Sequence, residues 1–313
     1  MSSMQIREGN PKADAEQIAE LLLASIPTIV TSAEEWLHRH RAVPPRAKRR
    51  LLVVEDEGRI AGMGVAGIVF FGGGGENGFL NINVHPECRR RGIGGELYRS
   101  LREHLLGLGV ARASSMFDEA PESVDFARNR GWAEERAETQ SILDPRTVTE
   151  RQPLDVELVP AVELDPHELH RIDEEGTRDL PSLVPIDAIP YDEWLEFVWE
   201  SPLFTREGSY GAVVDGRVAA ISFLTANLEH GRAFNMFTAT AREHRGRGLA
   251  LAVKLASTRW AVEQGITQLV TTNDETNAPM LAVNRRLGYR PSGRRVEYLV
   301  QRERLLREGR EDL

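Results

Sequence analysis

Two short turns rich in arginine and glycine carry the clearest chemical signal in this chain. Residues 89–95 are Arg-Arg-Arg-Gly-Ile-Gly-Gly, and residues 245–250 are Arg-Gly-Arg-Gly-Leu-Ala. Each turn follows an apolar stretch and precedes a long helical pattern, so each is expected between a strand and the start of a helix. Free N–H groups and the dipole at a helix start favour phosphate, glycines let the backbone approach it, and arginines add charge-assisted hydrogen bonds. Together the two turns predict a pyrophosphate site in at least one copy.

The turns match neither of two common nucleotide-binding motifs. A Walker loop continues with Gly-Lys-Ser or Gly-Lys-Thr, and neither turn does so. The dinucleotide pattern Gly-x-Gly-x-x-Gly is only approached, by residues 92–95. The sequence therefore favours neither a P-loop nor a dinucleotide-binding domain.

An internal repeat places the two turns at equivalent positions. Three segments recur in the same order at offsets of 156 to 158 residues. They are residues 57–61, 89–94 and 130–132, which match residues 215–219, 245–250 and 287–289. We therefore expect two similar domains, residues 1–145 and 154–313, joined near residues 145–153.

Each half predicts strands first and then alternating helix and strand. In the first half we expect strands at 4–8, 79–84, 113–117 and 134–143, a hairpin about 56–59, and helices at 13–24, 94–108 and 122–130. In the second half we expect strands at 156–159, 210–214, 218–226, 234–241, 268–272 and 294–301, and helices at 166–179, 191–200, 248–264 and 278–287. Leu251, Leu255, Thr258 and Val262 give the helix at 248–264 an apolar stripe. This order indicates the α/β class, with a mixed sheet covered by helices on both faces.

The pattern Arg-x-x-Gly-x-Gly/Ala between a strand and a long helix resembles the acetyl-CoA pyrophosphate loop of the GNAT superfamily of N-acetyltransferases. Both turns fit it, and residues 273–280 with 284–289 resemble the family's fifth strand and fourth helix. The resemblance covers almost the whole chain as two copies, in a layout similar to that of mycothiol synthase. It implies two tandem GNAT-like acyl-CoA N-acyltransferase domains, with acetyl-CoA (coenzyme A) as the cofactor.

The resemblance also implies where the cofactor lies. In this family the thioester occupies a gap between the fourth and fifth strands, where backbone N–H groups of the fourth strand polarise its carbonyl. The implied cofactor-binding residues of the second domain are Thr238, Ala239, Thr240, Arg245, Gly246, Arg247, Gly248, Leu249, Ala250, Asn273, Asn277 and Asn284. Those of the first domain are Ile82, Val84, Arg89, Arg90, Arg91, Gly92, Ile93, Gly94 and Gly95. Because residues 118–122 lack the asparagines, we expect the first domain to be structural or cofactor-binding and the second to be catalytic.

The family's proton-donating tyrosine is missing from both halves. Asn284 and Ala127 hold its position, and an asparagine can orient the thioester or a water but cannot act as the acid. Asp274 and Glu275 follow the fifth strand and are candidate bases, although capping of the next helix is an equally good interpretation. The remaining candidates are Glu229, His230 and His244 as bases, the last more suited to a phosphate neighbour, and Tyr191, Tyr210 and Tyr298 as substitutes for the acid.

Composition excludes several classes of function. The net charge of −9 argues against a nucleic-acid partner, and the longest nearly uncharged stretch, residues 60–75, is too short to cross a membrane. The single cysteine, Cys88, excludes a disulfide framework and a cysteine-based zinc cluster, and we expect no metal. Residues 1–11 are polar and do not resemble a signal peptide, so a cytoplasmic protein is expected.

Acidic residues are concentrated ahead of the second turn. Residues 155–200 contain 14 acidic residues and two arginines, a net charge of −12. They form solvated helix faces or, since the first two helices line the acceptor side in this family, a surface that attracts a cationic amine. The leading hypothesis is direct acetyl transfer from acetyl-CoA to an amine of a small, cationic molecule. The alternatives are a protein or peptide N-acetyltransferase and a non-catalytic acyl-CoA-binding regulator.

Overall fold

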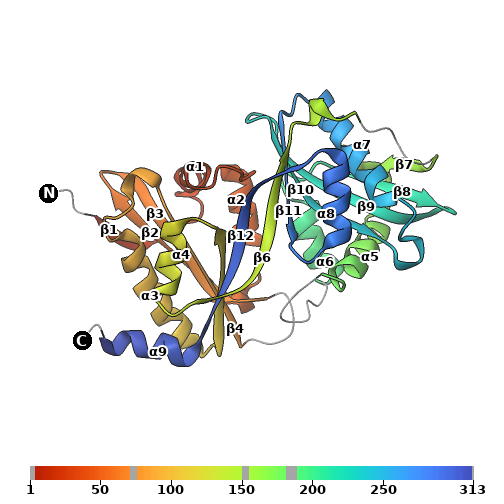
Figure 1. Cartoon of the computed structure of the whole chain (residues 1–313). Coiled ribbons are helices and arrows are strands. Elements are labelled where there is room, and N and C mark those ends of the chain that lie inside the picture. Colours follow the sequence, from red (N-terminus) through yellow and green to blue (C-terminus); the bar gives the residue numbers. More distant parts are fainter. Residues whose placement is uncertain (1–3, 71–75, 150–154, 181–188, 312–313) are drawn as a thin grey trace. The chain divides into compact units, whose positions relative to one another are not determined.

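The computed structural model describes residues 4–70, 76–149, 155–180 and 189–311, which fold as two compact units (Figure 1). The first unit consists of Met1–Ala137 and Arg294–Leu313, and the second of Glu138–Gly293. Both contain a mixed sheet with helices on both faces, so the expected fold class is confirmed. Residues 71–75 of the long uncharged stretch, 150–154 of the expected joint and Asp187 of the acidic segment lie outside the described residues.

The strands of the first unit follow the order β1-β2-β3-β4-β5-β12 within the sheet. Its strands are β1 (Gln5–Glu8), β2 (Arg50–Asp56), β3 (Arg59–Ile68), β4 (Asn77–Val84), β5 (Arg112–Asp118) and residues 295–301 of β12 (Arg290–Gln301), with β6 (Ala133–Leu143) starting here. Its helices are α1 (Ala15–Ser25), α2 (Ala33–Ala42), α3 (Ile93–Leu108), α4 (Pro121–Arg128) and α9 (Arg302–Glu311). Of the pairs between these strands, β4 with β5 is parallel and the others are antiparallel. Helices α2 and α9 have no counterpart among the expected elements.

The second unit repeats this arrangement. Its strands are β7 (Glu157–Pro160), β8 (Tyr210–Val214), β9 (Arg217–Asn227), β10 (Arg232–Thr240), β11 (Gln268–Asp274) and residues 138–143 of β6. Its helices are α5 (Pro166–Thr177), α6 (Tyr191–Trp194), which continues as one π-helical turn to Trp199, α7 (Leu249–Glu263) and α8 (Ala278–Leu287). Here β10 and β11 form the parallel pair.

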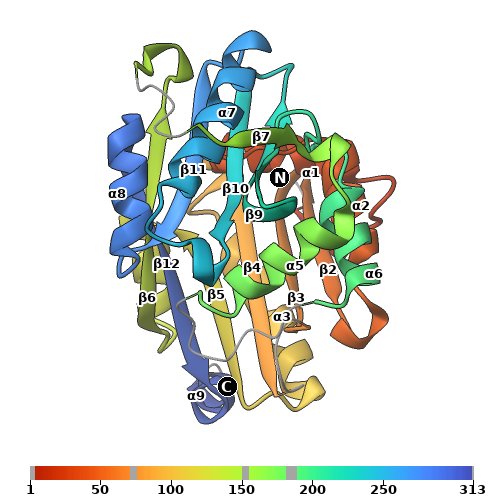
Figure 2. The ribbon, with the colours of Figure 1, turned by 90° about the vertical axis from the view of Figure 1, so that its right-hand side faces the viewer.

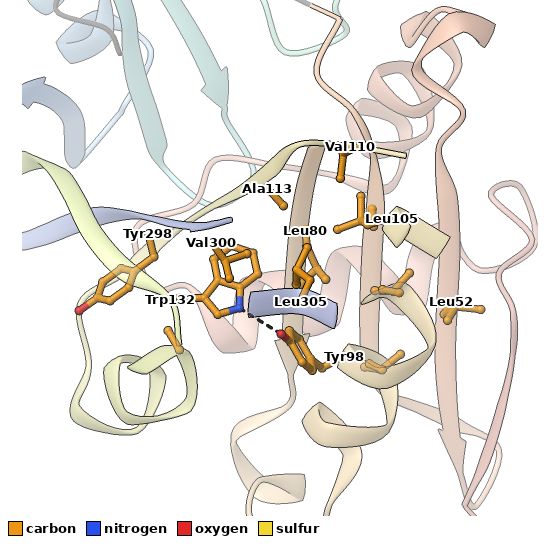
Figure 3. Close-up of a cluster of buried hydrophobic side chains, with 14 of the residues drawn as sticks. Leu52, Leu80, Tyr98, Leu105, Val110, Ala113, Trp132, Tyr298, Val300 and Leu305 are labelled. Carbon is orange, nitrogen blue, oxygen red and sulfur yellow. Dashed lines mark hydrogen bonds between the residues drawn. The ribbon is translucent and has the colours of Figure 1, made fainter. Parts of the chain in front are cut away.

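The last strand of each unit comes from the other half of the sequence. Residues 295–301 of β12 pair with β5, and residues 138–143 of β6 pair with β11. Tyr298 and Val300 of β12 and Leu305 of α9 are buried beside Trp132, whose indole N–H donates to the Tyr98 hydroxyl at 3.2 Å (Figure 3). The compact units therefore differ from the expected stretches 1–145 and 154–313, because an alternating strand pattern does not specify which sheet the strand joins.

Helices cover both faces of each sheet because the central strands are apolar on both sides. In β9 alternate residues point in opposite directions, so Ile221 and Phe223 pack with α5 and α6 while Leu224 packs with α7. Figure 2 labels these helices together with the strands β9 and β10. The apolar stripe expected for α7 accounts for only some of the residues that this helix buries. Ten of its fifteen residues are buried, including Lys254, whereas Val262 is 40% exposed.

Candidate functional site

The second arginine–glycine turn connects β10 to α7 through two residues in left-handed conformation. A short 3-10 helix, Arg242–His244, follows β10, and Arg245 is extended. Gly246 and Gly248 then adopt φ values of 75° and 82°, and α7 begins at Leu249. No protein atom lies within 4 Å of a Cβ built at Gly246. This glycine is therefore required by its backbone conformation, and the space beside it is open to a ligand.

The first turn has the same backbone geometry. Arg90 and Gly92 have φ values of 61° and 84°, and α3 begins at Ile93. Arg90 thus holds, in the place of Gly246, a conformation that costs a non-glycine residue about 1–2 kcal/mol. A Cβ at Gly94 would lie 3.3 Å from the Phe126 ring, so this glycine allows α3 to approach α4. Both sequence-predicted turns are therefore formed at helix starts.

The parallel strands diverge in both units, as the family resemblance implied. β10 pairs with β11 only through residues 232–234 and 268–270, and β4 pairs with β5 only through residues 77–79 and 112–114. A bulge lies between Asn235 and Phe237, and Thr238, Ala239 and Thr240 beyond it pair with β9 alone. The side of β10 that faces away from β9 therefore keeps peptide groups that the sheet does not use.

Two of the predicted asparagines meet at the end of β11. Asn284 on α8 is 2% exposed, and its Nδ2 donates to Oδ1 of Asn273 at 2.6 Å. Its own Oδ1 is buried and has no hydrogen-bond partner among the described residues. An unpaired buried acceptor is costly, so this atom is suited to receive an N–H from a ligand.

The other candidates after β11 have structural contacts. Oδ1 of Asp274 accepts from the backbone N–H of Thr276 at 2.8 Å, and Asn277 caps α8 by accepting from the N–H of Met280 at 3.2 Å. Glu275 is exposed. These contacts are those expected for residues that shape the turn before α8.

Ion pairs surround the arginines of both turns. In the second unit Arg245 pairs with Asp179 at 2.5 Å, and Arg247 lies 3.3 Å from Nδ1 of His244. In the first unit the pairs are Arg89 with Glu122 at 2.9 Å and Arg91 with Asp56 at 2.7 Å. The guanidinium groups of Arg89, Arg91 and Arg245 therefore already face carboxylates that an incoming phosphate would replace or share.

The acidic segment is largely engaged with its own unit. Asp165 caps α5, Glu168 pairs with Arg171 and Arg217, and Glu174 pairs with Arg178. Glu175 accepts from the backbone N–H of Arg242 at 2.6 Å. Of the described acidic residues of this segment, Glu168, Glu174 and Asp179 are paired with arginines.

The first unit lacks the paired amides. Ala127 is buried in the core at the position equivalent to Asn284. At the end of β5, Arg295 lies 3.4 Å from Asp118 and Arg294 lies 3.0 Å from Glu119. Burial raises the pKa of Asp118. The gap of this unit therefore ends in carboxylate–arginine pairs where the second unit has asparagines.

Asp173 is a candidate that the sequence did not single out. It lies on α5, half-buried, with Oδ2 accepting from Nε1 of Trp194 at 2.5 Å and Oδ1 accepting from Thr177 at 3.2 Å. Burial raises its pKa to about 6. One turn further along α5, a Cβ at Gly176 would lie 2.6 Å from Ala239 and 3.0 Å from Phe237, so α5 lies directly on the strand beyond the bulge. No spacing signal distinguishes Asp173 from the acidic residues around it.

The remaining candidates lie on other elements than α8 and the turn before it. Glu229 and His230 lie in the turn before β10, at the other end of the strand from the arginine turn, roughly 25 Å away. Tyr298 belongs to the first unit and stacks on Phe117 at 5.2 Å. Tyr191 stacks on His167 at 3.8 Å and on Trp194 at 6.1 Å, and Tyr210 lies in β8. None of them lies on α8, where the resemblance implied the missing tyrosine.

Two features are absent from the described part of the chain. No group of three or more His, Cys, Asp or Glu residues there is arranged to hold a metal ion. None of the described helices combines the length and apolar character needed to cross a membrane.

Comparison with known proteins gives a consistent result. The model of the acetyltransferase (GNAT) family matches residues 15–132 and 169–289. No curated protein sequence matches the chain. A GCN5-related N-acetyltransferase from Sphaerobacter thermophilus has a TM-score of 0.67 and 19% identity, over 95% of both chains. A tandem GNAT protein from the clavulanic acid biosynthesis pathway has a TM-score of 0.73 and 22% identity, over 96% of this chain and 98% of its own. N-myristoyltransferase from Saccharomyces cerevisiae, with bound myristoyl-CoA, has a TM-score of 0.64 and 10% identity, over 96% and 79%. At these identities the structural matches show a shared fold.

Proposed function

Because the chain belongs to the GNAT acetyltransferase family, we propose that its second unit transfers an acetyl group from acetyl-CoA to an amine of a small, cationic molecule. The observation that carries this proposal is the junction of β10 and α7. At this junction β10 leads to the start of α7 through Gly246 and Gly248, both in left-handed conformation, and through the arginines 245 and 247. Beyond residue 234, the edge of β10 on the side of β11 pairs with no described strand. This combination suits a diphosphate followed by an extended amide-containing chain.

The residues of the second unit fit acetyl-CoA at both ends of this junction. The N–H groups at the start of α7 and the arginines would hold the diphosphate, and the free edge of β10 would hold the pantetheine amides. The unpaired Oδ1 of Asn284 would accept a hydrogen bond from the same molecule. Acetyl-CoA itself supplies the activated acetyl thioester.

Asp173 is the carboxylate that we propose as acceptor for the amine proton. It is half-buried on α5, on the helix that lies against Phe237 and Ala239 of β10. A pKa of about 6 leaves it ionised at neutral pH yet close enough to the working pH to accept a proton efficiently. Asp274 and Glu275 remain alternative bases.

No tyrosine is available as acid at position 284. Asn284 would orient the thioester, and the leaving thiolate would take its proton from water. General acids contribute about 10²–10⁴-fold to rate, so we expect slow turnover compared with a relative that has the tyrosine. The same substitution favours a second candidate function, an acyl-CoA-binding regulator without turnover. We propose that the first unit, with Ala127 at this position, has no catalytic role.

Two measurements test the proposal. Isothermal calorimetry with coenzyme A and acetyl-CoA tests binding, and thiol release from acetyl-CoA tests transfer to spermidine and kanamycin, compared with glucosamine and glutamate. We expect binding, and turnover that is fastest at low ionic strength with spermidine and kanamycin, the two acceptors that carry several positive charges. Faster turnover with glutamate or glucosamine would contradict a cationic acceptor. Binding of acetyl-CoA without turnover would favour the acyl-CoA-binding regulator. No binding of coenzyme A or acetyl-CoA would overturn the proposed function.

A further inference from the structure

A second group of basic residues lies in the first unit, away from its arginine turn. It borders a surface pocket of about 270 Å³ lined by His40, Val43, Pro44, Pro45, Lys48 and Arg49. The pocket is formed where α2 ends and β2 begins. His40 is fixed there by stacking on Trp36, with ring centroids 5.3 Å apart.

Arg49 is the unusual residue of this pocket. Its Nε is buried and has no hydrogen-bond partner, and no described carboxylate forms an ion pair with its guanidinium. Burial lowers the pKa of Arg49 to about 10, and burial together with the Arg49 charge lowers the pKa of His40 to about 4. Nδ1 of His40 is likewise buried and unpaired. Arg49 is half-buried, and a buried donor such as its Nε costs free energy when it has no partner, so an anion that accepts from this guanidinium would stabilise the unit.

The pocket is distinct from the arginine turn of the same unit. Arg50 pairs with Ala66, and Ala66 pairs with Leu80 in the middle of β4. The turn follows Val84 at the end of β4, roughly 14 Å further along the strand. His104, in the C-terminal half of α3, lies 2.8 Å from the carbonyl of Lys48, whereas the turn precedes the first residue of α3. A ligand bound at the arginine–glycine turn therefore contacts other residues than those that line the Arg49 pocket.

We propose that this pocket binds the carboxylate or phosphate group of a small molecule, with Arg49 as the principal ligand. Lys48 adds a second positive charge on the pocket wall, and Val43, Pro44 and Pro45 provide an apolar rim for the rest of the molecule. The first unit, which lacks the paired amides of the second, would then carry a ligand site of its own.

The test measures thermal unfolding of the full chain in about 10 mM sodium phosphate, sodium acetate or sodium chloride at equal ionic strength. We expect phosphate or acetate to raise the Tm of the wild type by about 2–4 °C above chloride. Arg49→Met should lose this rise, and Arg41→Met, which removes an exposed charge nearby, should keep it. Phosphate also stabilises proteins by exclusion and binds arginine-rich turns, so only the difference between wild type and Arg49→Met supports the site.

Two further measurements test the site, and the second uses the wild type, so it does not need Arg49→Met to fold. In chloride, Arg49→Met should melt at a higher temperature than the wild type, because it removes a half-buried charge whose buried Nε has no partner. In the wild type, phosphate or acetate should shift the imidazole NMR signals of His40, assigned with His40→Gln. An equal rise in Tm for wild type and Arg49→Met, or unchanged His40 signals, overturns the anion site. Neither result depends on acetyl transfer, so the proposed function is tested separately.

Discussion

Oδ2 of Asp179 lies 2.5 Å from Nη2 of Arg245, so the acidic segment supplies a counter-charge to the first arginine of the second turn. Oδ1 of the same carboxylate lies 2.5 Å from Nη2 of Arg242. Hydrogen bonds from Arg242 and Arg245 lower the pKa of Asp179 to about 2, which keeps it ionised at neutral pH. Asp179 therefore acts on the second arginine–glycine turn, the proposed site of the diphosphate.

Asp179→Asn should strengthen coenzyme A binding. The substitution frees Arg245 from a competing carboxylate, so the Kd at low ionic strength should fall by about 3–10-fold and the gain should shrink in salt. Calorimetry measures both effects. Glu174→Gln is a matched control, since Glu174 pairs with Arg178 at 2.6 Å and removal of its charge leaves the turn unchanged. Weaker binding by Asp179→Asn would instead mean that Asp179 holds Arg245 in its binding position.

Gly248→Glu should abolish acetyl transfer, whereas Gly92→Glu should leave it within about threefold of the wild type. Both glycines have left-handed φ values, 82° and 84°, so the backbone strain of the two variants is matched. The glutamate at 248 places charge and bulk where the diphosphate of the catalytic unit would lie. Initial rates of thiol release measure acetyl transfer by the two variants, and circular dichroism melts verify that both variants fold. Loss of activity only in Gly92→Glu would move catalysis to the first unit.

Local features of both turns could be predicted from sequence because glycine position, basic residues and helix start are all encoded within a few neighbouring residues. The divergence of β10 from β11 followed from the family resemblance rather than from any residue pattern. The exchange of β6 and β12 was not predictable, since Val296, Tyr298 and Val300 alternate as they would in either sheet. The pairing of Asp179 with Arg245 joins residues 66 positions apart, and a count of acidic residues does not identify their partners.

Asp173 should give the reaction an acid limb near pH 6. Its carboxylate must be ionised to accept a proton, so kcat/KM should fall as the pH drops through that value. Trp194→Phe removes the indole N–H that stabilises the ionised form, and the acid limb should move to higher pH. Asp173→Asn should remove most of the activity. An unchanged profile in Trp194→Phe would assign Asp173 a structural role and favour Asp274 or Glu275.

Asp173 should make the protein more stable as the pH falls, whereas a carboxylate in a salt bridge makes a protein less stable as the pH falls. Its native pKa of about 6 lies above the unfolded value of about 3.9, so the folded state binds the proton more tightly. This group therefore contributes stability that appears as the pH falls from about 7 to 4. Asp173→Asn should flatten that dependence in urea unfolding, whereas Asp165→Asn, at the exposed cap of α5, should keep it.

Lys254→Met should stabilise the second unit at neutral pH. Lys254 is 3% exposed, its Nζ donates to Oδ1 of Asn235, and it lies 5.2 Å from the centre of the Tyr289 ring. Burial lowers its pKa to about 7, whereas the unfolded chain titrates near 10.4, so the unfolded state binds the extra proton between these values. Stability from this group is full above about pH 10.4 and is lost as the pH falls towards 7.

The methionine keeps the length of the side chain without that proton, and Oδ1 of Asn235 still accepts from Thr238 at 3.0 Å. We therefore expect a gain of about 1–3 kcal/mol in urea unfolding at pH 7 and a smaller slope of stability against pH between 7 and 10. Lys12→Met, which removes an exposed charge from the first unit, should change neither quantity. A less stable Lys254→Met with the slope of the wild type would mean that Lys254 stays protonated in the fold, and that its contacts with Asn235 and Tyr289 outweigh the cost of burying the charge.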